Sequence, residues 1–170
     1  MQGEEALRLK LSAVKNELAN ANVQWVVFAG ADAYCYGSRR KVTDIDILVK
    51  NVDLEISKNI LKDIEGVDVI ADLEIKTKEG NCRIFMDDEM IKRLQWRQLF
   101  GVTVPVVPVE DNIIFKAILQ RGEAQGKHDI EDIQRMAMGE MIELDYLEKR
   151  IRKYRAEKRV RPVLKRLGIL

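Results

Sequence analysis

Two short apolar runs, separated by a segment that begins with glycine, constrain the fold of this chain more than any other feature. Residues 24–29 and 44–49 are rich in β-branched and aromatic side chains, which is typical of buried strands. Gly30 ends the first run, and the second opens with Asp44 and Asp46. Because side chains at i and i+2 of a strand point to the same side, these two carboxylates share one face, with β-carbons about 7 Å apart.

The remaining pattern predicts an α+β fold, in which a small mixed β-sheet with flanking helices is followed by a helical C-terminal end. Apolar periodicity and glycine stops predict helices over 4–21, 32–36, 53–64, 88–99, 110–121, 129–138 and 144–155. Further strands are expected over 67–76, 81–86 and 102–107, with a hairpin turn at 78–81 and with Pro105 making the last run an edge strand or an irregular segment. These elements form a core over 1–108 and a helical extension over 109–170, packed on the core or merged with it into a single domain.

Composition excludes several classes of protein. The chain has 170 residues, of which 46% are hydrophobic and 34% charged, with 29 basic side chains against 28 acidic ones. These values are typical of a globular domain and exclude a disordered or fibrous chain. The first residues are acidic, unlike a signal peptide, and no run approaches the ~18 apolar residues of a membrane span. We therefore expect a cytoplasmic protein without a membrane partner, and the sequence allows a homodimer.

Basic residues gather near the end of the chain, from Lys149 to Arg166. A segment of this kind attracts phosphate-rich partners through counterion release. It can equally form a solvated helix whose charges pair along its own face, and the sequence favours this second interpretation.

The paired aspartates point to a metal and to phosphates. Two carboxylates on one face repel each other unless a cation lies between them, and their hard oxygen atoms suit Mg²⁺ or Mn²⁺, which also binds substrate phosphates. The strand-glycine-helix unit at Gly30 and Ala31 offers backbone N–H groups to such phosphates. Asp44 and Asp46 are therefore candidate metal ligands, and the turn before them is a candidate phosphate-binding element.

The stretch from Gly30 to Asp46 resembles the nucleotidyltransferase superfamily, which includes DNA polymerase beta, aminoglycoside nucleotidyltransferases and minimal stand-alone nucleotidyltransferases. Its members carry a Gly-Ser or Gly-Gly turn, a short helix and then Asp-x-Asp on a strand. The resemblance extends to the segments around Lys116 and Lys127 and covers roughly residues 23 to 135. It implies that both lysines contact phosphate, although surface lysines of amphipathic helices fit them equally well.

Two features depart from the pattern of active superfamily members. Ala31 stands where they have Ser or Gly, which removes a hydroxyl contact to phosphate, and Asp32 puts a negative charge near the phosphate site. The second departure concerns a third carboxylate, which active enzymes place on a neighbouring strand to complete the metal site and to accept a proton. The strand expected at 82–87 has no acid at its centre.

Three other acids are candidates for the third carboxylate, namely Glu74, Asp72 and Asp87, although the sequence favours a surface charge over a ligand for each of them. We prefer Glu74, because it lies within a predicted strand between the apolar residues Leu73 and Ile75.

The resemblance implies a nucleotidyltransferase that moves a nucleoside monophosphate from an NTP to a hydroxyl acceptor on a protein, an RNA or a small molecule. The predicted catalytic residues are Asp44, Asp46 and Glu74, the predicted ligands of Mg²⁺ or Mn²⁺ are Asp44 and Asp46, and the predicted triphosphate contacts are Gly30, Ala31, Lys116 and Lys127. The alternative is a degenerate, non-catalytic member of the fold that binds a nucleotide or a partner, for example as one component of a toxin/antitoxin module.

Overall fold

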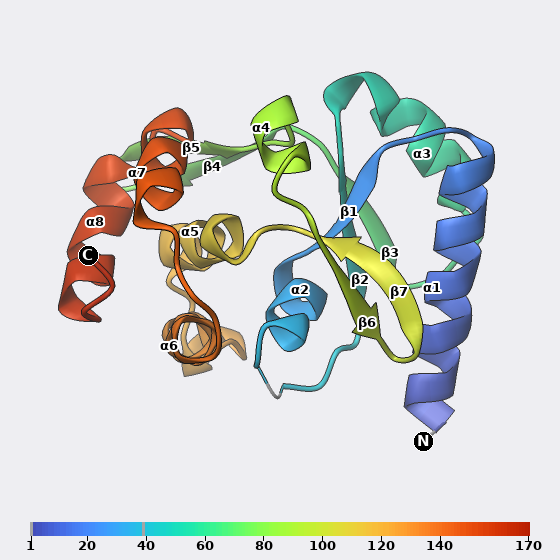
Figure 1. Ribbon diagram of the computed structural model, residues 1–170, viewed down its shortest axis with the longest axis horizontal. Coiled ribbons are helices and arrows are strands. Elements are labelled where there is room, and N and C mark those ends of the chain that lie inside the picture. Colours follow the sequence, from blue (N-terminus) through green and yellow to red (C-terminus); the bar gives the residue numbers. More distant parts are fainter. Residues whose placement is uncertain (1, 39) are drawn as a thin grey trace.

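A five-stranded mixed sheet lies at the centre of the computed structural model, which describes residues 2–38 and 40–170 (Figure 1). Its strands are β1 (Trp25–Phe28), β2 (Ile45–Val49), β3 (Val67–Ile70), β6 (Gln95–Leu99) and β7 (Val102–Val106). They are arranged in the order β3-β2-β1-β7-β6. β2 runs antiparallel to β1 and parallel to β3, while β7 runs parallel to β1 and antiparallel to β6. The predicted α+β class with a mixed sheet is confirmed.

Helices cover both sides of this sheet. They are α1 (Gln2–Asn20), α2 (Ala29–Cys35) and α3 (Leu54–Leu61), the last preceded by the 3-10 turn η1 (Asn51–Asp53). α1 and α3 contact each other on one side of the sheet, and α2 packs against β1, β2 and β6 on the other (Figure 1). α1 buries Leu7, Leu11, Val14 and Leu18, which recur every three or four residues as an amphipathic helix requires.

A two-stranded hairpin and a group of helices form the other half of the molecule. The hairpin consists of β4 (Leu73–Thr77) and β5 (Gly80–Ile84), and the helices are α4 (Asp88–Ile91), α5 (Val109–Leu119), α6 (Asp129–Gly139), α7 (Leu144–Lys153) and α8 (Glu157–Arg166), with the 3-10 turn η2 (Glu123–Gln125) before α6. α5 contacts α2, α6, α7 and α8, and its residues from Val109 to Ile118 are all buried. One hydrophobic cluster runs from α1 to α8 and joins the two halves. In the described ranges, no helix is long and apolar enough to cross a membrane.

The helix predicted over 88–99 is wrong beyond its first turn, which is α4. The rest of that segment forms β6, which pairs with β7 across a turn at Phe100 and Gly101. Both turn residues have positive φ angles, 51° and 85°, as a two-residue hairpin connection requires. Strand pairing overrides the local helical spacing because it buries Leu99 completely within the shared core.

The run at 102–107 is an inner strand, contrary to the edge strand or irregular segment that Pro105 suggested. β7 lies between β1 and β6. Its pairing with β1 is confined to Val27 and Val106, and the N–H of Val107 donates to the Val27 carbonyl at 3.0 Å. Pro105 precedes this paired region, so its missing N–H interrupts no hydrogen bond to β1.

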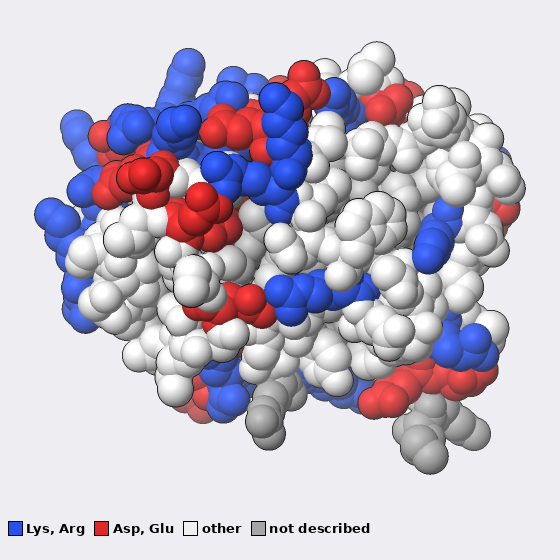
Figure 2. Space-filling view, in the orientation of Figure 1, with Lys and Arg blue, Asp and Glu red and all other residues white. Residues whose placement is uncertain are grey.

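The basic end of the chain is helical, and several of its charges hold it to other elements. Lys153 Nζ lies 2.7 Å from Asp87 Oδ2, and Arg159 Nη1 lies 3.4 Å from Glu79 Oε2 at the tip of the hairpin. The remaining exposed bases of this segment are Lys149, Arg152, Arg155, Lys158, Lys165 and Arg166. Figure 2 shows Lys and Arg side chains gathered over the region of α7, α8 and the hairpin, with Asp and Glu between them.

A buried polar network around Arg150 fastens α7 to α5 and to the end of the hairpin. The Arg150 side chain is fully buried, and its Nε donates to Asp111 Oδ1 at 2.8 Å while its Nη1 donates to Asp87 Oδ2 at 2.7 Å. The hydroxyls of Tyr146 and Tyr154 donate to the same Asp111 carboxylate. Each buried charge in the network therefore has an opposite charge within hydrogen-bond distance, which offsets its desolvation.

Replacing Arg150 by alanine should lower the free energy of unfolding by about 3–5 kcal/mol, because the buried Asp111 carboxylate loses its counter-ion. The neighbouring Arg152 is exposed, so Arg152→Ala should change that free energy by less than about 0.5 kcal/mol. Urea denaturation of both variants measures the difference. Equal midpoints for the two variants would contradict a structural role for the network.

Candidate active site

An open pocket of about 270 Å³ contains most of the predicted site residues. One wall is formed by the end of β1 and the start of α2, a second by the loop before β2 and the start of β2 itself, and a third by α5 and the segment that leads into α6. Its lining includes Gly30, Ala31, Asp44, Asp46, Lys116 and Lys127, together with Lys41 and Arg121. We call this the active pocket. The structure therefore brings six predicted residues, far apart in sequence, into one place.

We call the part of the pocket formed by Asp44 and Asp46 the acidic wall. The alternation of side chains along β2 positions it. Ile45 and Ile47 are fully buried, and Asp46, which lies between them in sequence, faces the active pocket. In register, Asp46 is paired with Phe28 of β1 and with Asp68 of β3. Because paired residues on adjacent strands point to the same face of a sheet, Asp68 lies beside Asp46 on that face. Its side chain is exposed and borders the active pocket without lining it.

Burial and the neighbouring acids both disfavour the ionised form of Asp46. The pKa of Asp46 is raised from its ordinary 3.8 to about 6, mainly by burial and then by the charges of Asp68 and Asp44, while the charges of Lys127 and Lys116 lower it. No described residue forms an ion pair with any of the three carboxylates. The acidic wall is thus a concentration of negative charge that the described residues do not neutralise.

The sequence did not suggest Asp68 as a candidate for the third carboxylate, and the preferred candidate, Glu74, lies outside the active pocket. The run predicted over 67–76 is two strands, β3 and β4, which separate at Asp72. Glu74 is exposed on β4 of the hairpin, opposite Arg83, and does not line the active pocket. The signal that could have identified Asp68 is its place as the only acid inside the β-branched run from Val67 to Ile70.

The two other candidates for a third carboxylate have partners of their own. Asp72 forms an ion pair with Arg83. Asp87 accepts a hydrogen bond from the backbone N–H of Met90 at 2.9 Å, which caps α4, and it also pairs with the buried Arg150. Neither lines the active pocket.

The start of α2 at Gly30 forms an open wall of the active pocket. A β-carbon built on Gly30 would meet no atom within 4 Å, so the space above this residue is part of the pocket. Asp32, which was expected to bring negative charge near this wall, is fully buried behind it and does not line the pocket. Burial, reinforced by the charge of Asp111, raises the pKa of Asp32 well above its ordinary value, which favours the neutral carboxyl. The turn therefore faces the pocket without the expected negative charge.

We call the part of the pocket formed by Lys116, Arg121 and Lys127 the cationic wall. Some of these bases form ion pairs and one does not. Lys116 is buried, and its Nζ lies 3.2 Å from Asp132 Oδ2 and 3.4 Å from Asp129 Oδ1. Arg121 also pairs with Asp129, at 3.0 Å. Lys127 is exposed and forms no ion pair with a described residue. Of the two predicted lysines, Lys127 is thus the one whose charge is available to a ligand, while Lys116 shares its charge with two acids.

The donor set fits a divalent cation that is completed by its substrate. Within the described part of the chain, no three His, Cys, Asp or Glu side chains form a ready-made metal centre. Mg²⁺ rarely uses such cages, because it binds one or two carboxylates and takes its remaining ligands from phosphates and water. Asp44 and Asp46, with Asp68 adjacent, match this second kind of site.

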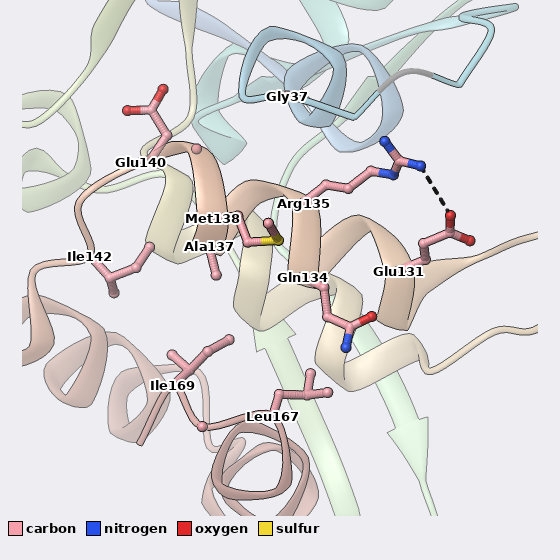
Figure 3. A pocket seen from close by; sticks show the side chains of 12 residues that line it. Gly37, Glu131, Gln134, Arg135, Ala137, Met138, Glu140, Ile142, Leu167 and Ile169 are labelled. Carbon is pink, nitrogen blue, oxygen red and sulfur yellow. Dashed lines mark hydrogen bonds and ion pairs between the residues drawn. The ribbon is translucent and has the colours of Figure 1, made fainter.

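A larger hollow of about 1040 Å³ lies between α6 and the turn that follows α8 (Figure 3). Its labelled lining includes Met138, Ile142, Leu167 and Ile169, and neither acid of the Asp44 and Asp46 pair takes part. Size alone therefore does not identify the site, and the smaller active pocket holds the groups that can bind a cation and phosphates.

Comparison with known proteins identifies the family of this chain. A family model described as nucleotidyl transferase of unknown function (DUF2204) matches residues 72–168, more than half of the chain. The chain belongs to this nucleotidyltransferase family. The matched region carries the cationic wall, whereas the acidic wall lies before it. The search of curated proteins finds no match to the sequence.

Solved structures with the same fold include other nucleotidyltransferases. The solution structure of the antibiotic-resistance factor ANT(2'')-Ia superposes with a TM-score of 0.60 at 11% identity, over 88% of this chain and 91% of that one. Its crystal structure with adenylyl-2''-tobramycin gives 0.53 at 12% identity, over 87% and 96% of the two chains. A Thermotoga maritima protein, TM1012, described as a nucleotidyltransferase, gives 0.52 at 19% identity, over 88% and 94%. At these identities the likeness confirms the nucleotidyltransferase fold.

Replacing Asp46 by asparagine should stabilise the metal-free protein at pH 7.5 but not near pH 4. The raised pKa means that the folded state holds the proton more tightly than the unfolded state, so the stability contributed by Asp46 falls as pH rises from about 4 through about 6. We expect a gain on the order of 1–3 kcal/mol at pH 7.5, where the ionised carboxylate is repelled by its neighbours.

Thermal melts in EDTA at both pH values measure this change, with the exposed Asp63→Asn as a control that should not show it. A lower melting temperature of Asp46→Asn at pH 7.5 would show that the carboxylate is stabilised rather than strained in the folded state.

Proposed function

We propose that the active pocket binds a nucleoside triphosphate with Mg²⁺ or Mn²⁺ and transfers its nucleoside monophosphate to a hydroxyl acceptor. The observation that carries this proposal is that one pocket is lined by acids and by bases, with Asp44 and Asp46 from the acidic wall and Lys127 from the cationic wall, whose charge acts on Asp46. A triphosphate with a divalent cation is a ligand with both signs of charge, and it complements both walls at once.

Each wall has a distinct role in this proposal. Asp44 and Asp46 hold the cation, which when bound neutralises phosphate charge and links the phosphates to the acidic wall. Lys127 attracts the triphosphate, and the paired Lys116 and Arg121 add positive potential beside it. The open space at Gly30 lets phosphate oxygens approach the backbone.

The transfer itself makes and breaks one bond to phosphorus. The acceptor oxygen bonds to the α-phosphorus, the bond between that phosphorus and the oxygen bridging to the β-phosphate breaks, and pyrophosphate leaves. The acceptor hydroxyl loses a proton in this step. We assign that proton to Asp68, because its register beside Asp46 places a carboxylate on the pocket face of the sheet. Glu74 remains the alternative that the sequence suggested for this role.

The competing function is nucleotide binding without turnover. Ala31 favours it, because the residue lines the active pocket and offers no hydroxyl to a phosphate. The burial of Asp32 weighs against it, since the expected repulsion of phosphate by that carboxylate is absent from the pocket wall.

Triphosphates should stabilise the protein only when the acidic wall is intact. In the presence of Mg²⁺, a ligand at about 100 times its Kd adds roughly 2.7 kcal/mol to the stability of the folded state, which raises the melting temperature. The double variant Asp44→Asn, Asp46→Asn should lose this increase. The matched double variant Asp63→Asn, Glu65→Gln changes two exposed acids at the same spacing and should keep it. An equal increase in both variants would place triphosphate binding outside the active pocket.

Asp68 and Glu74 can be distinguished by transfer activity. Incubation with α-labelled triphosphates, Mn²⁺ and cell extract should label an acceptor, and Asp68→Asn should reduce the rate by roughly 10²-fold or more, as expected for loss of a proton acceptor. Glu74→Gln should leave the rate unchanged, and both variants should retain the melting-temperature increase with triphosphate. The reverse pattern would assign the third carboxylate to Glu74. Triphosphate binding without any transfer by the unchanged protein would instead favour the non-catalytic function.

A further inference from the structure

A second pocket adjoins the active pocket. It has a volume of about 620 Å³ and lies between α1, α2, the loop before β2 and the turn between β6 and β7. We call it the α1 pocket. Lys41, Val42 and Thr43 line both pockets, so the two are separated only by one short stretch of loop. A volume of this size is typical of sites that bind small ligands.

One side chain from the lining of each pocket also approaches Gly66. A β-carbon built on this residue, whose φ is 74°, would lie 2.8 Å from Lys10 Nζ and 3.4 Å from Asp44 Oδ1. The ammonium group of the α1 pocket and a carboxylate of the active pocket therefore approach the same backbone position. A ligand held by Lys10 lies close to the acids at the start of β2, which is the proximity that a transfer reaction needs.

Aromatic rings form one wall of the α1 pocket. Tyr34 of α2 and Phe100 of the β6–β7 turn both line it, and their rings are stacked with centroids 5.3 Å apart and an interplanar angle of 30°. Tyr34 is 37% exposed. A stacked pair with an accessible ring offers a flat apolar surface, which favours a planar ligand such as a nucleobase.

Positive charge predominates in the same pocket. Lys10 and Lys41 line it and form no ion pair with a described residue, whereas the nearby Arg40 is paired with Glu131 and Asp132. Glu4 is the acid in the lining. Two available ammonium groups beside an aromatic surface match a ligand that carries both a phosphate and a ring.

We propose that the α1 pocket binds the hydroxyl acceptor and that this acceptor is a nucleotide, either free or at the end of an RNA. The inference rests on the proposed function of the active pocket. The base stacks on Tyr34 and Phe100, Lys10 and Lys41 bind its phosphate, and a ribose hydroxyl faces the shared loop. That hydroxyl oxygen bonds to the α-phosphorus of the triphosphate, pyrophosphate leaves, and the hydroxyl proton passes to Asp68.

A polycationic acceptor fits this pocket poorly. The similar structure of ANT(2'')-Ia contains adenylyl-2''-tobramycin, in which the modified group is an aminoglycoside. In the α1 pocket, Lys10 and Lys41 would repel the amino groups of such a molecule, and Glu4 alone would not balance them. The charge of the pocket therefore separates a nucleotide from an aminoglycoside.

Calorimetric titrations test this inference. AMP, a short single-stranded RNA with a free 3'-hydroxyl, and tobramycin are each titrated into the full chain, alone and with Mg²⁺ and a non-hydrolysable triphosphate that fills the active pocket. We expect AMP or the RNA to bind in both conditions and more tightly than tobramycin. Tighter binding of the RNA identifies an RNA end as the source of the nucleotide, and tighter binding of AMP identifies a free nucleotide.

Matched variants locate the binding. Tyr34→Ala and Lys10→Gln should each lower the affinity for AMP and the RNA by roughly 5- to 100-fold, the range associated with loss of one base stack or one phosphate contact. Trp96→Ala and Lys58→Gln remove an exposed aromatic and an exposed lysine outside the pocket and should leave these affinities unchanged. Thermal melts verify that each variant is folded. If Tyr34→Ala does not fold, Lys10→Gln alone serves as the test.

The inference is overturned if tobramycin binds more tightly than both nucleotide probes, if none of the probes binds, or if Tyr34→Ala and Lys10→Gln leave the affinities unchanged. Its failure is distinguishable from failure of the proposed function, because triphosphate binding is read separately from the melting temperature. If the protein binds triphosphate but not the nucleotide probes, only the proposed acceptor site is contradicted. If Lys10→Gln retains triphosphate binding and loses probe binding, the proposed function and the proposed acceptor site are both supported.

Discussion

The packing of β2 into the core is the interaction on which the site depends. Burial of Ile45, Ile47 and Val49 is complete, and three such side chains contribute roughly 5–9 kcal/mol. The cost of ionising Asp46, judged from a pKa that burial and the neighbouring acids raise to about 6, is on the order of 3 kcal/mol. Hydrophobic packing therefore outweighs this cost and fixes Asp46 on the opposite face of the strand.

The cationic wall depends on ion pairs that offset the burial of a charged group. Lys116 is buried at the base of the active pocket, and a buried ammonium group is tolerated because Asp129 and Asp132 lie within ion-pair distance. This arrangement fixes α5 against α6 and sets the position of the segment that carries Lys127. Farther along α5, Asp111 pairs with Arg150 and fastens the same helix to α7. The family match covers these helices, and the fold brings them to the acids that precede the matched region.

The two adjoining pockets divide the chemistry by charge and shape. The active pocket is lined by carboxylates and by bases, whereas the α1 pocket is lined by lysines and a stacked aromatic pair. The loop at Lys41, Val42 and Thr43 lines both pockets.

The amino-acid sequence by itself determined what local geometry controls. The two-residue period of a strand placed Asp44 and Asp46 on one face, Gly30 marked the turn that precedes them, and helical spacing located α1, α5, α6 and α7. Only the tertiary structure decided that Asp68 lies beside Asp46, that Glu74 belongs to a separate hairpin, and that Gln95 to Leu99 form a strand. The reason is that pairing between strands joins residues distant in the chain, and its register follows from the shared core rather than from the pattern of any one segment.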